Sequence, residues 1–376
     1  MVGPGDPKTE PRRKGSPTGG VAREEKPTAR TMTNKTQPTS SRASQTGPTR
    51  RTGSPSSPGD PVIPSVEVNT VKAASPVTGR VVESRLCTAG GAKAAGFVRH
   101  VSIDVSGTPL AGRFVSGQSF GVVPPGNDDK GRPHRLRLYS IASPTRGEDG
   151  AGNVLATTVK RLLDEDHETH KLFRGVCSNY LCDAQVGDEI LVTGPSGKRF
   201  ILPADTGAHD YVFFATGTGI APFRGMIRDL LESGSPSSIT LVMGVPYRTD
   251  LLYDDDLRGL AERHDNFRYV TAISREAQDD SDRKMYVQDR IEHDQLGTGP
   301  GSLADRLASD RTLVYVCGLT GMELGIFRAL YRVLGADTAS AYLSVDEEAA
   351  GDPDAWTKRM INRSLRTTRR MFLEVY

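Results

Sequence analysis

The sequence predicts a two-domain β + α/β protein, in which a small antiparallel β-barrel precedes a doubly wound parallel sheet. From about residue 66 to residue 203, short apolar segments are separated by turn residues, which is typical of a small barrel. After residue 203, apolar runs without polar alternation are separated by helical patterns, which is typical of a parallel sheet covered on both faces. The 376 residues, 36% of them apolar, suffice for two packed domains and an appendage.

The appendage is expected at the beginning of the chain. Residues 1 to about 60 consist mainly of Pro, Thr, Ser, Gly, Lys and Arg, with few aliphatic and no aromatic residues. Such a segment buries too little apolar surface to offset its conformational entropy, so residues 1–65 are expected to form a disordered arm or linker. Residues 32–58 lack acidic side chains and resemble a plastid transit peptide, with a flexible linker as the alternative. Two locations therefore stay open: the cytoplasm, which is the default, and the plastid stroma.

Composition narrows the class of protein further. A net charge of +2 argues against a protein built as a whole for nucleic acid. No apolar run approaches the length of a transmembrane helix, and no signal-peptide core stands at the start. The spacing of the four cysteines matches neither a zinc pair nor an iron–sulfur motif. We therefore expect a soluble protein, a reducing compartment and no bound metal.

The barrel is expected to occupy residues 66–206, and the α/β domain residues 207–376. The barrel strands are predicted at 79–86, 97–105, 120–123, 137–142, 154–159 and 189–193. Parallel strands are predicted at 211–215, 239–244, 267–273 and 313–317, with helices at 222–231, 252–263 and 322–334. Apolar residues at 371–373 and 375 indicate that the end of the chain docks as a strand. Ligands of such a sheet bind at the carboxyl ends of its strands, so the chemistry should lie in the loops that follow them.

Two of these loops favour a phosphorylated nucleotide. Thr216-Gly217-Thr218-Gly219 follows a strand and precedes a helix, so its N–H groups can face a phosphate, although a tight turn without a ligand is the alternative. Ser274 and Arg275 end another strand, and Lys284 and Tyr286 follow about ten residues later. Together they offer the groups that neutralise a phosphate dianion and stack on adenine, the chemistry that distinguishes NADPH from NADH. The alternative is an ordinary solvated charged loop.

The strand with the sequence R-L-Y-S suits a second nucleotide. Arg137 and Tyr139 share one face of the strand, and Ser140 points to the other. A guanidinium suits a pyrophosphate, a phenol packs on a flat ring, and a hydroxyl can bond to a ring nitrogen; the alternative is plain strand surface.

Cys317 ends the last parallel strand before Gly318, where a cysteine is usually a small buried hydrophobe. With no histidine near it in sequence, it is not expected to be a nucleophile.

Taken in order, these stretches resemble plant-type ferredoxin–NADP(+) reductase from about residue 71 to residue 376. The matching stretches are G-Q-S-F-G-V-V-P (117–124), R-L-Y-S-I-A-S (137–143), V-K-R-L (159–162), G-V-C-S-N-Y-L-C-D (175–183), G-T-G-I-A-P-F-R (217–224), G-V-P (244–246), S-R-E (274–276), K-M-Y-V-Q (284–288), C-G-L-T-G-M-E (317–323) and the terminal E-V-Y. The resemblance implies an FAD-binding barrel and an NADP-binding α/β domain.

The resemblance also implies the residues of each site. It implies FAD contacts at Arg137, Leu138, Tyr139, Ser140, Thr158, Val159, Lys160, Gly175, Val176, Cys177, Ser178, Thr216 and Tyr376. It implies NADP contacts at Ser140, Lys160, Thr216, Val245, Pro246, Ser274, Arg275, Lys284, Tyr286, Gln288, Gly318, Leu319 and Glu374. It implies catalytic roles, around flavin N5 and nicotinamide C4, for Ser140, Cys317, Glu374 and Tyr376. Tyr376 would stack on the flavin and give way to the nicotinamide.

Three positions depart from the family pattern. Thr158 stands where the family usually has cysteine, and Met371 stands where a tryptophan is common. Asp164 stands where a tyrosine commonly stacks on the FAD adenine, which puts the strength of FAD binding in doubt.

The resemblance implies an acidic partner, ferredoxin or flavodoxin, that exchanges electrons with NADP(H) through FAD. Basic residues that suit such a partner are Lys130, Arg132 and Arg135, together with Lys358, Arg359, Arg363, Arg366, Arg369 and Arg370. A solvated basic face is the alternative reading of these charges. We expect a monomer. Two other functions stay open: the NADPH-dependent reductase component of an oxygenase system, and a non-catalytic interaction scaffold with a vestigial reductase fold.

Overall fold

The computed structural model describes residues 59–94, 96–166, 168–278, 282–294 and 301–376. The arm expected at residues 1–65 lies mostly outside these residues. Its last part, from residue 59, follows the folded chain, because the backbone N–H of Ala204 donates to the carbonyl of Val62 at 2.9 Å. In the described part of the chain, no helix is long and apolar enough to cross a membrane.

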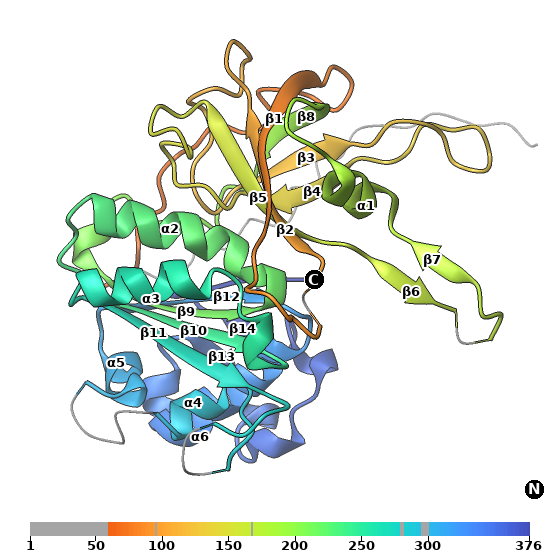
Figure 1. Ribbon diagram of the computed structural model, residues 1–376. Coiled ribbons are helices and arrows are strands. Elements are labelled where there is room, and N and C mark those ends of the chain that lie inside the picture. Colours follow the sequence, from red (N-terminus) through yellow and green to blue (C-terminus); the bar gives the residue numbers. More distant parts are fainter. Residues whose placement is uncertain (1–58, 95, 167, 279–281, 295–300) are drawn as a thin grey trace, which may run out of the picture. The chain divides into compact units, whose positions relative to one another are not determined.

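The first domain is a six-stranded antiparallel sheet, with the strand order β4-β3-β8-β1-β2-β5 (Figure 1). Its strands are β1 (Val77–Leu86), β2 (Val98–Asp104), β3 (Ser119–Val123), β4 (Arg137–Ser140), β5 (Val154–Lys160) and β8 (Glu189–Ser196). The outer strands of this order meet through a bridge between Ile141 and Thr157, and the N–H of Ala142 donates to the carbonyl of Ala156 at 2.7 Å. All six predicted barrel strands are confirmed. Their inward side chains, among them Val81, Val101 and Phe120, form one apolar core.

A two-stranded ribbon and a short helix complete this domain, and neither is among the elements predicted from the sequence. The ribbon consists of β6 (Leu163–Glu165) and β7 (Leu172–Arg174), and α1 (Val176–Asp183) follows directly. In Figure 1 the ribbon projects beyond the six-stranded sheet, and α1 stands at its base. The ribbon is anchored there because the Asn179 side chain donates to the carbonyls of Leu162 and Gly175 at 3.0 and 2.7 Å.

The second domain is a five-stranded parallel sheet with the order β11-β10-β9-β12-β15. Its strands are β9 (Asp210–Thr216), β10 (Ile239–Val245), β11 (Phe267–Ile273), β12 (Thr312–Gly318) and β15 (Met371–Val375). The four predicted parallel strands and the docked C-terminal strand are confirmed. A small antiparallel pair, β13 (Leu343–Val345) and β14 (Leu365–Thr367), lies outside this sheet.

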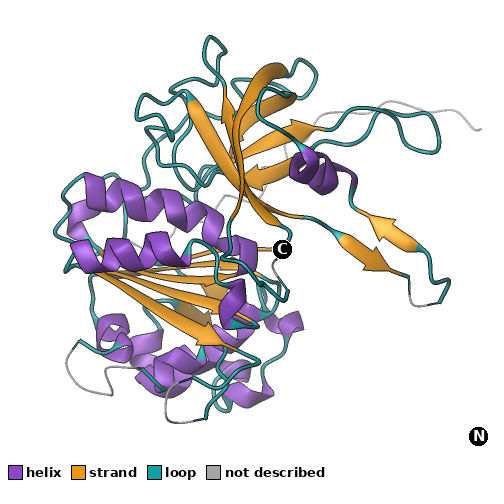
Figure 2. Ribbon diagram, in the orientation of Figure 1, coloured by secondary structure: helices purple, strands orange, loops and turns teal. Residues whose placement is uncertain are grey.

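Helices cover both faces of the parallel sheet (Figure 2). One face packs against α2 (Ile220–Glu232) and α3 (Asp254–Arg263), and the other packs against α4 (Asp289–Glu292), α5 (Leu303–Ala308) and α6 (Met322–Ala339). The strands have apolar side chains on both faces, as a sheet covered on both sides requires. The doubly wound architecture predicted from the sequence is therefore confirmed.

A buried polar network joins the barrel to α2 and α3. Arg224 of α2 donates to the carbonyl of Ala142 at 3.0 Å and to the Glu148 carboxylate at 2.5 Å. Its guanidinium lies 5.2 Å from the ring centre of Tyr253. The Tyr253 hydroxyl in turn lies 2.9 Å from His100 Nδ1 and 2.6 Å from Thr158 Oγ1. Burial, with the charge of nearby Arg224, lowers the pKa of His100 well below its usual value, so this imidazole is neutral at pH 7.

Candidate functional site

The strand order of the parallel sheet reverses between β9 and β12, and ligands of open α/β sheets bind at such a switch point. The two loops there are tightly joined, because Thr216 Oγ1 accepts the N–H of Leu319 at 2.9 Å. Glycine is required on both sides of the junction. A Cβ at Gly219 would lie 2.2 Å from the carbonyl of Cys317, and a Cβ at Gly318 would lie 2.1 Å from Thr216 Oγ1. The first turn of α2 has no side-chain cap, which leaves backbone N–H groups available at this point.

A cavity of about 480 Å³ opens at the switch point, where the barrel meets the carboxyl ends of the strands. Of the nucleotide-binding residues expected from the sequence, Lys160, Thr216, Val245, Pro246, Ser274, Tyr286, Gln288, Leu319 and Tyr376 line it. The structure does not place Ser140, Arg275, Lys284, Gly318 or Glu374 on its wall. The cavity is large enough for part of a dinucleotide, and its rim carries the exposed side chains of Tyr286 and Leu319.

Of the expected phosphate-binding residues, Ser274 and Tyr286 line this cavity, and Arg275 and Lys284 adjoin them in the chain outside its wall. Met285 donates its N–H to the carbonyl of Ile273 at 2.8 Å, so Lys284 and Tyr286 flank the end of β11 beside Ser274. Arg275 and Lys284 are exposed, and the Arg275 guanidinium lies 5.8 Å from the ring centre of Tyr247. A hydroxyl, two cations and an exposed phenol therefore surround one site, which suits a phosphate dianion next to an adenine.

The C-terminal residue lies across the cavity. The N–H of Tyr376 donates to the carbonyl of Gly318 at 2.9 Å, and the N–H of Thr320 donates to the carbonyl of Tyr376 at 3.0 Å. The Tyr376 hydroxyl lies 2.7 Å from Thr218 Oγ1. Although the residue is held at both ends, 56% of it remains exposed. A flat ring thus lies beside the glycine-rich turn, and its stacking on a flavin stays a prediction.

Cys317 and Glu374 are neighbours on the parallel strands β12 and β15. Cys317 is fully buried, and burial, with the nearby charge of Glu374, raises the pKa of its thiol well above the usual value. It therefore stays protonated, in agreement with a packing role rather than a nucleophilic one. Glu374 is unusual because its Oε2 is buried without a hydrogen-bond partner in the described part of the chain. Burial raises the pKa of Glu374 from 4.5 to about 7.

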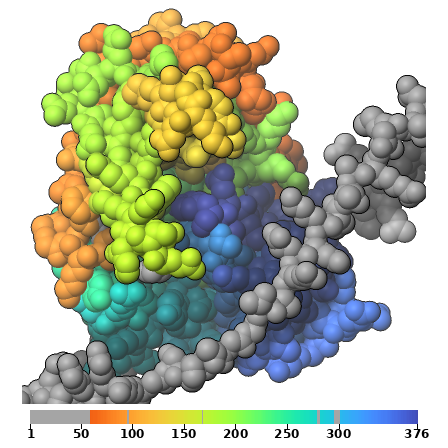
Figure 3. All heavy atoms as spheres, turned by 90° about the vertical axis from the view of Figure 1, so that its right-hand side faces the viewer, coloured from red at the N-terminus to blue at the C-terminus, as the bar shows by residue number. Residues whose placement is uncertain are grey.

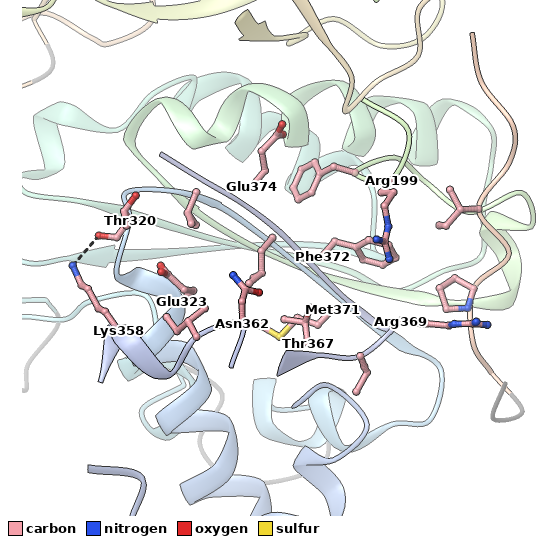
Figure 4. A pocket seen from close by; sticks show the side chains of 17 residues that line it. Arg199, Thr320, Glu323, Lys358, Asn362, Thr367, Arg369, Met371, Phe372 and Glu374 are labelled. Atoms are coloured by element: carbon pink, nitrogen blue, oxygen red, sulfur yellow. Dashed lines mark hydrogen bonds between the residues drawn. The ribbon is translucent and has the colours of Figure 1, made fainter. Parts of the chain in front are cut away.

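Glu374 faces a second cavity, a groove of about 880 Å³ along β15. Figure 4 shows this groove, with Thr320 and Lys358 on the left, Glu374 along its upper edge, and Arg199 and Arg369 on the right. Lys358 donates to the carbonyl of Thr320 at 3.3 Å, which closes one side. Glu374 thus borders the groove, and Tyr376, two residues later, borders the first cavity.

Several of the residues expected to hold FAD lie on β4 and at the start of α1, next to the base of the β6–β7 ribbon. Arg137 and Leu138 of β4 are exposed, and Tyr139 is partly buried. Burial, together with the adjacent Cys177 thiol of α1, raises the pKa of Tyr139, so this contact joins β4 to the start of α1. Helix α1 begins after Gly175 without a side-chain cap. Its open N–H groups and the Arg137 guanidinium suit a pyrophosphate.

Exposed apolar side chains extend this surface and also suit FAD. Leu138, Leu163, Phe173 and Val176 are each 44–58% exposed. Exposed apolar side chains are candidates for contact with a ligand, although Leu163 and Phe173 project from opposite faces of the ribbon. Thr158 does not face it, because its hydroxyl is buried against Tyr253. Figure 3 shows this side of the molecule, where the yellow-green ribbon and the yellow loop before β4 stand above the dark blue C-terminal part.

Four of the expected docking cations are already engaged: Arg132, Lys358, Arg366, which pairs with Asp346, and Arg370. Arg132 forms an ion pair with Asp128, in which Nη2 and Nε of Arg132 both donate to Oδ2 of Asp128, at 2.7 and 3.0 Å. Arg370 is buried, donates to the carbonyls of Ser309 and Thr312, and stacks over Tyr342. The expectation that Arg370 belongs to a surface patch is therefore wrong. Lys130 and Arg135 are exposed.

Sequence reasoning missed the apolar floor of the first cavity. Ala94 and Val98 reach it from the barrel, and Leu252, Met285 and Met322 reach it from the second domain. In a single sequence these residues look like ordinary core or loop positions, so no local signal marks them.

Residues 213–326 match a family model described as the oxidoreductase NAD-binding domain. Ferredoxin--NADP reductase of Spirulina sp is 38% identical over 277 residues, which cover 72% of this chain and 90% of that protein. The reductase of Synechocystis sp. is 40% identical over 270 residues, or 70% of this chain and 63% of that protein. The chloroplastic leaf isozyme 1 of ferredoxin--NADP reductase from Arabidopsis thaliana is 38% identical over 267 residues, which cover 69% of this chain and 71% of that protein. The chain thus spans less than two thirds of the Synechocystis relative.

Solved structures share the fold. Ferredoxin-NADP+ reductase from Plasmodium falciparum superimposes with a TM-score of 0.58 at 21% identity, over 82% of this chain and 99% of that chain. An antiparallel β-domain followed by a parallel sheet that matches the oxidoreductase NAD-binding domain places the chain among the oxidoreductases. More narrowly, the chain belongs to the ferredoxin–NADP reductase family, whose cofactors are FAD and NADP.

Proposed function

We propose that this chain transfers electrons between ferredoxin, or flavodoxin, and NADP(H) through FAD. The observation that carries the proposal is the cavity at the switch point, where Thr216 and Leu319 of the second domain meet Lys160 of the barrel and Tyr376. A site built by both domains can bring a flavin and a nicotinamide together, as hydride transfer between them requires. We keep residues 66–206 and 207–376 as the FAD and NADP domains.

When bound, FAD couples one-electron exchange with the partner to hydride transfer at the nicotinamide. The chain's own residues position and shield this reaction. Arg137 and the start of α1 would hold the pyrophosphate of FAD, and the Thr216–Gly219 turn would hold that of NADP. Tyr376 would shield the flavin and give way to the nicotinamide. Ser140 would supply a hydrogen bond to the flavin ring, and Glu374, whose Oε2 is buried without a hydrogen-bond partner among the described residues, would hold a proton there.

Purified protein that carries no flavin absorbance would overturn this proposal. In its support, NADPH should bleach that absorbance under anaerobic conditions, and the reduced protein should pass electrons to ferredoxin. NADPH-dependent reduction of a dye without any transfer to ferredoxin or flavodoxin would instead favour the reductase component of an oxygenase system.

Replacing Arg275 with alanine is expected to raise the KM for NADPH by about 10- to 100-fold, because one charge-assisted hydrogen bond to the 2′-phosphate contributes about 1.5–3 kcal/mol. A Plasmodium falciparum relative has been solved with 2'P-AMP, which carries this phosphate. The KM for NADH should not change, since NADH lacks the group. Arg283, an exposed arginine in the same segment, provides the control, and Arg283→Ala should leave both values unchanged. An equal rise for NADH and NADPH after Arg275→Ala would contradict the assignment.

Replacing Arg135 with glutamate is expected to raise the KM for ferredoxin by about tenfold at low ionic strength and by less in high salt, because exposed charges are screened. Arg132→Glu should have a smaller effect, because the Arg132 guanidinium is already hydrogen-bonded to Asp128 and is less free to contact a partner. NADPH-to-dye activity should be unchanged in both variants. Arg80→Glu, on β1 and paired with Glu189, is the matched control. If Arg135→Glu lowers dye and ferredoxin turnover equally, the docking assignment fails.

We propose that the protein acts as a monomer in the cytoplasm, as its four buried free cysteines favour a reducing compartment. Sedimentation of the purified protein tests the first point. Mass spectrometry of the N-terminus in the source cells tests the second, because removal of a leader at about residue 58 would favour the plastid stroma.

A further inference from the structure

Phe173 lies on β7 of the two-stranded ribbon, and 58% of it is exposed. Such a ribbon has no core of its own, so a ring at this position buries little surface. No aromatic ring or cation stacks on Phe173 within the described residues. A large exposed apolar side chain that is not needed for folding is a candidate contact for a ligand.

The register of the ribbon places Phe173 directly opposite Asp164 on β6. Directly opposed residues of an antiparallel pair project from the same face, with Cβ atoms roughly 4.5–5.5 Å apart. The ring therefore projects from the same face as Asp164. At the position of Asp164, the family commonly has a tyrosine that stacks on the FAD adenine. Leu163, Leu172 and Arg174 project from the opposite face.

The ribbon also places the ring within reach of the FAD cradle. Phe173 precedes Gly175 by two residues, which is roughly 7 Å along an extended strand. Gly175 donates its N–H to the carbonyl of Leu162 at 3.0 Å, and Leu162 donates its own to Ser178 Oγ at 3.2 Å. These bonds fix the base of the ribbon against the start of α1. An adenosyl group that extends from a pyrophosphate at that helix start would thus meet this ribbon.

We propose that Phe173 stacks on the adenine of FAD and makes the site selective for the dinucleotide over FMN. In this chain the aromatic contact comes from Phe173 on β7, the cross-strand neighbour of position 164, and not from position 164 itself. This inference rests on the proposed function, since it requires FAD on the barrel. It resolves the doubt raised by Asp164, because the chain supplies a flat ring on the same face from a different strand.

The test is a titration of the full-length protein, stripped of flavin, with FAD and separately with FMN. Loss of base stacking by alanine substitution weakens binding by about 5- to 150-fold, so Phe173→Ala should raise the Kd for FAD by about tenfold or more. The Kd for FMN should be unchanged, since FMN has no adenine. Leu172→Ala removes a neighbouring side chain that is even more exposed, but on the opposite face, and should change neither value.

Two further variants test the geometry. Phe173→Tyr should keep the affinity for FAD, and adding Asp164→Tyr to Phe173→Ala should restore it, because the new ring projects from the same face. Equal weakening of FAD and FMN by Phe173→Ala, no weakening of either, or failure of Asp164→Tyr to restore binding would overturn the inference. A wild-type protein that binds FAD and FMN equally would overturn it while leaving the proposed function intact. A wild-type protein that binds no flavin would overturn the proposed function itself.

Discussion

Replacing Arg224 with methionine is expected to lower the free energy of unfolding by about 3–5 kcal/mol, because removing one partner of a buried ion pair leaves the other charge uncompensated. Arg224 is 5% exposed and contacts both the Glu148 carboxylate and the carbonyl of Ala142. It also stacks over Tyr253, which is hydrogen-bonded to the barrel. A single side chain of α2 thus joins three separate segments at the domain interface.

Chemical denaturation followed by flavin fluorescence and by far-ultraviolet circular dichroism measures this loss. Two probes are needed because a two-domain protein need not unfold in one step. Arg258→Met is the matched control: Arg258 pairs with Asp254 on the surface of α3, and an exposed pair contributes about 1 kcal/mol or less. The double variant Arg224→Met with Glu148→Gln should be less destabilised than the sum of the two single variants. A loss below that of Arg258→Met would show that Arg224 does not hold the interface.

The sequence predicted those parts of the molecule that leave a local pattern. The parallel strands are continuous apolar runs, and the Thr216–Gly219 turn contains glycines that steric contact requires, so both were predictable. The β6–β7 ribbon was not, because three-residue strands with exposed side chains show no periodicity. Tyr253 and His100 are 153 residues apart, and no local pattern reports that they meet.

Charge was the least predictable property of the site. The sequence gives the positions of the arginines, but it does not show that Arg132 is paired with Asp128 or that Arg370 is buried over Tyr342. Ion pairing and burial depend on tertiary contacts, and these decide which cations remain for a partner. The same reasoning applies to Glu374, because only the packed structure shows that its Oε2 is buried without a hydrogen-bond partner among the described residues.

Replacing Glu374 with glutamine is expected to slow NADPH-dependent turnover by about 100-fold or more, in the range of general acid–base contributions. Burial raises the pKa of Glu374 from 4.5 to about 7, so it is protonated at pH 6 and ionised at pH 8. Wild-type turnover in the direction that uses this proton should therefore fall as the pH rises through about 7, and the glutamine variant should lack this limb. Glu189→Gln, an exposed residue of β8, is the control. A glutamine variant that keeps the wild-type pH profile would exclude Glu374 as the proton carrier.

The same pKa predicts an effect on stability with a defined sign. The folded protein binds the Glu374 proton more tightly than the unfolded chain does, so this contribution is complete below pH 4.5 and is lost as the pH rises to about 7. A pKa shift of this size corresponds to a loss on the order of 3 kcal/mol in the free energy of unfolding. Glu374→Gln cannot ionise, so it should be more stable than the wild type at pH 8 and no more stable at pH 4.5. If Glu374→Gln is both slower in catalysis and more stable than the wild type at pH 8, the buried carboxylate contributes to catalysis and not to stability.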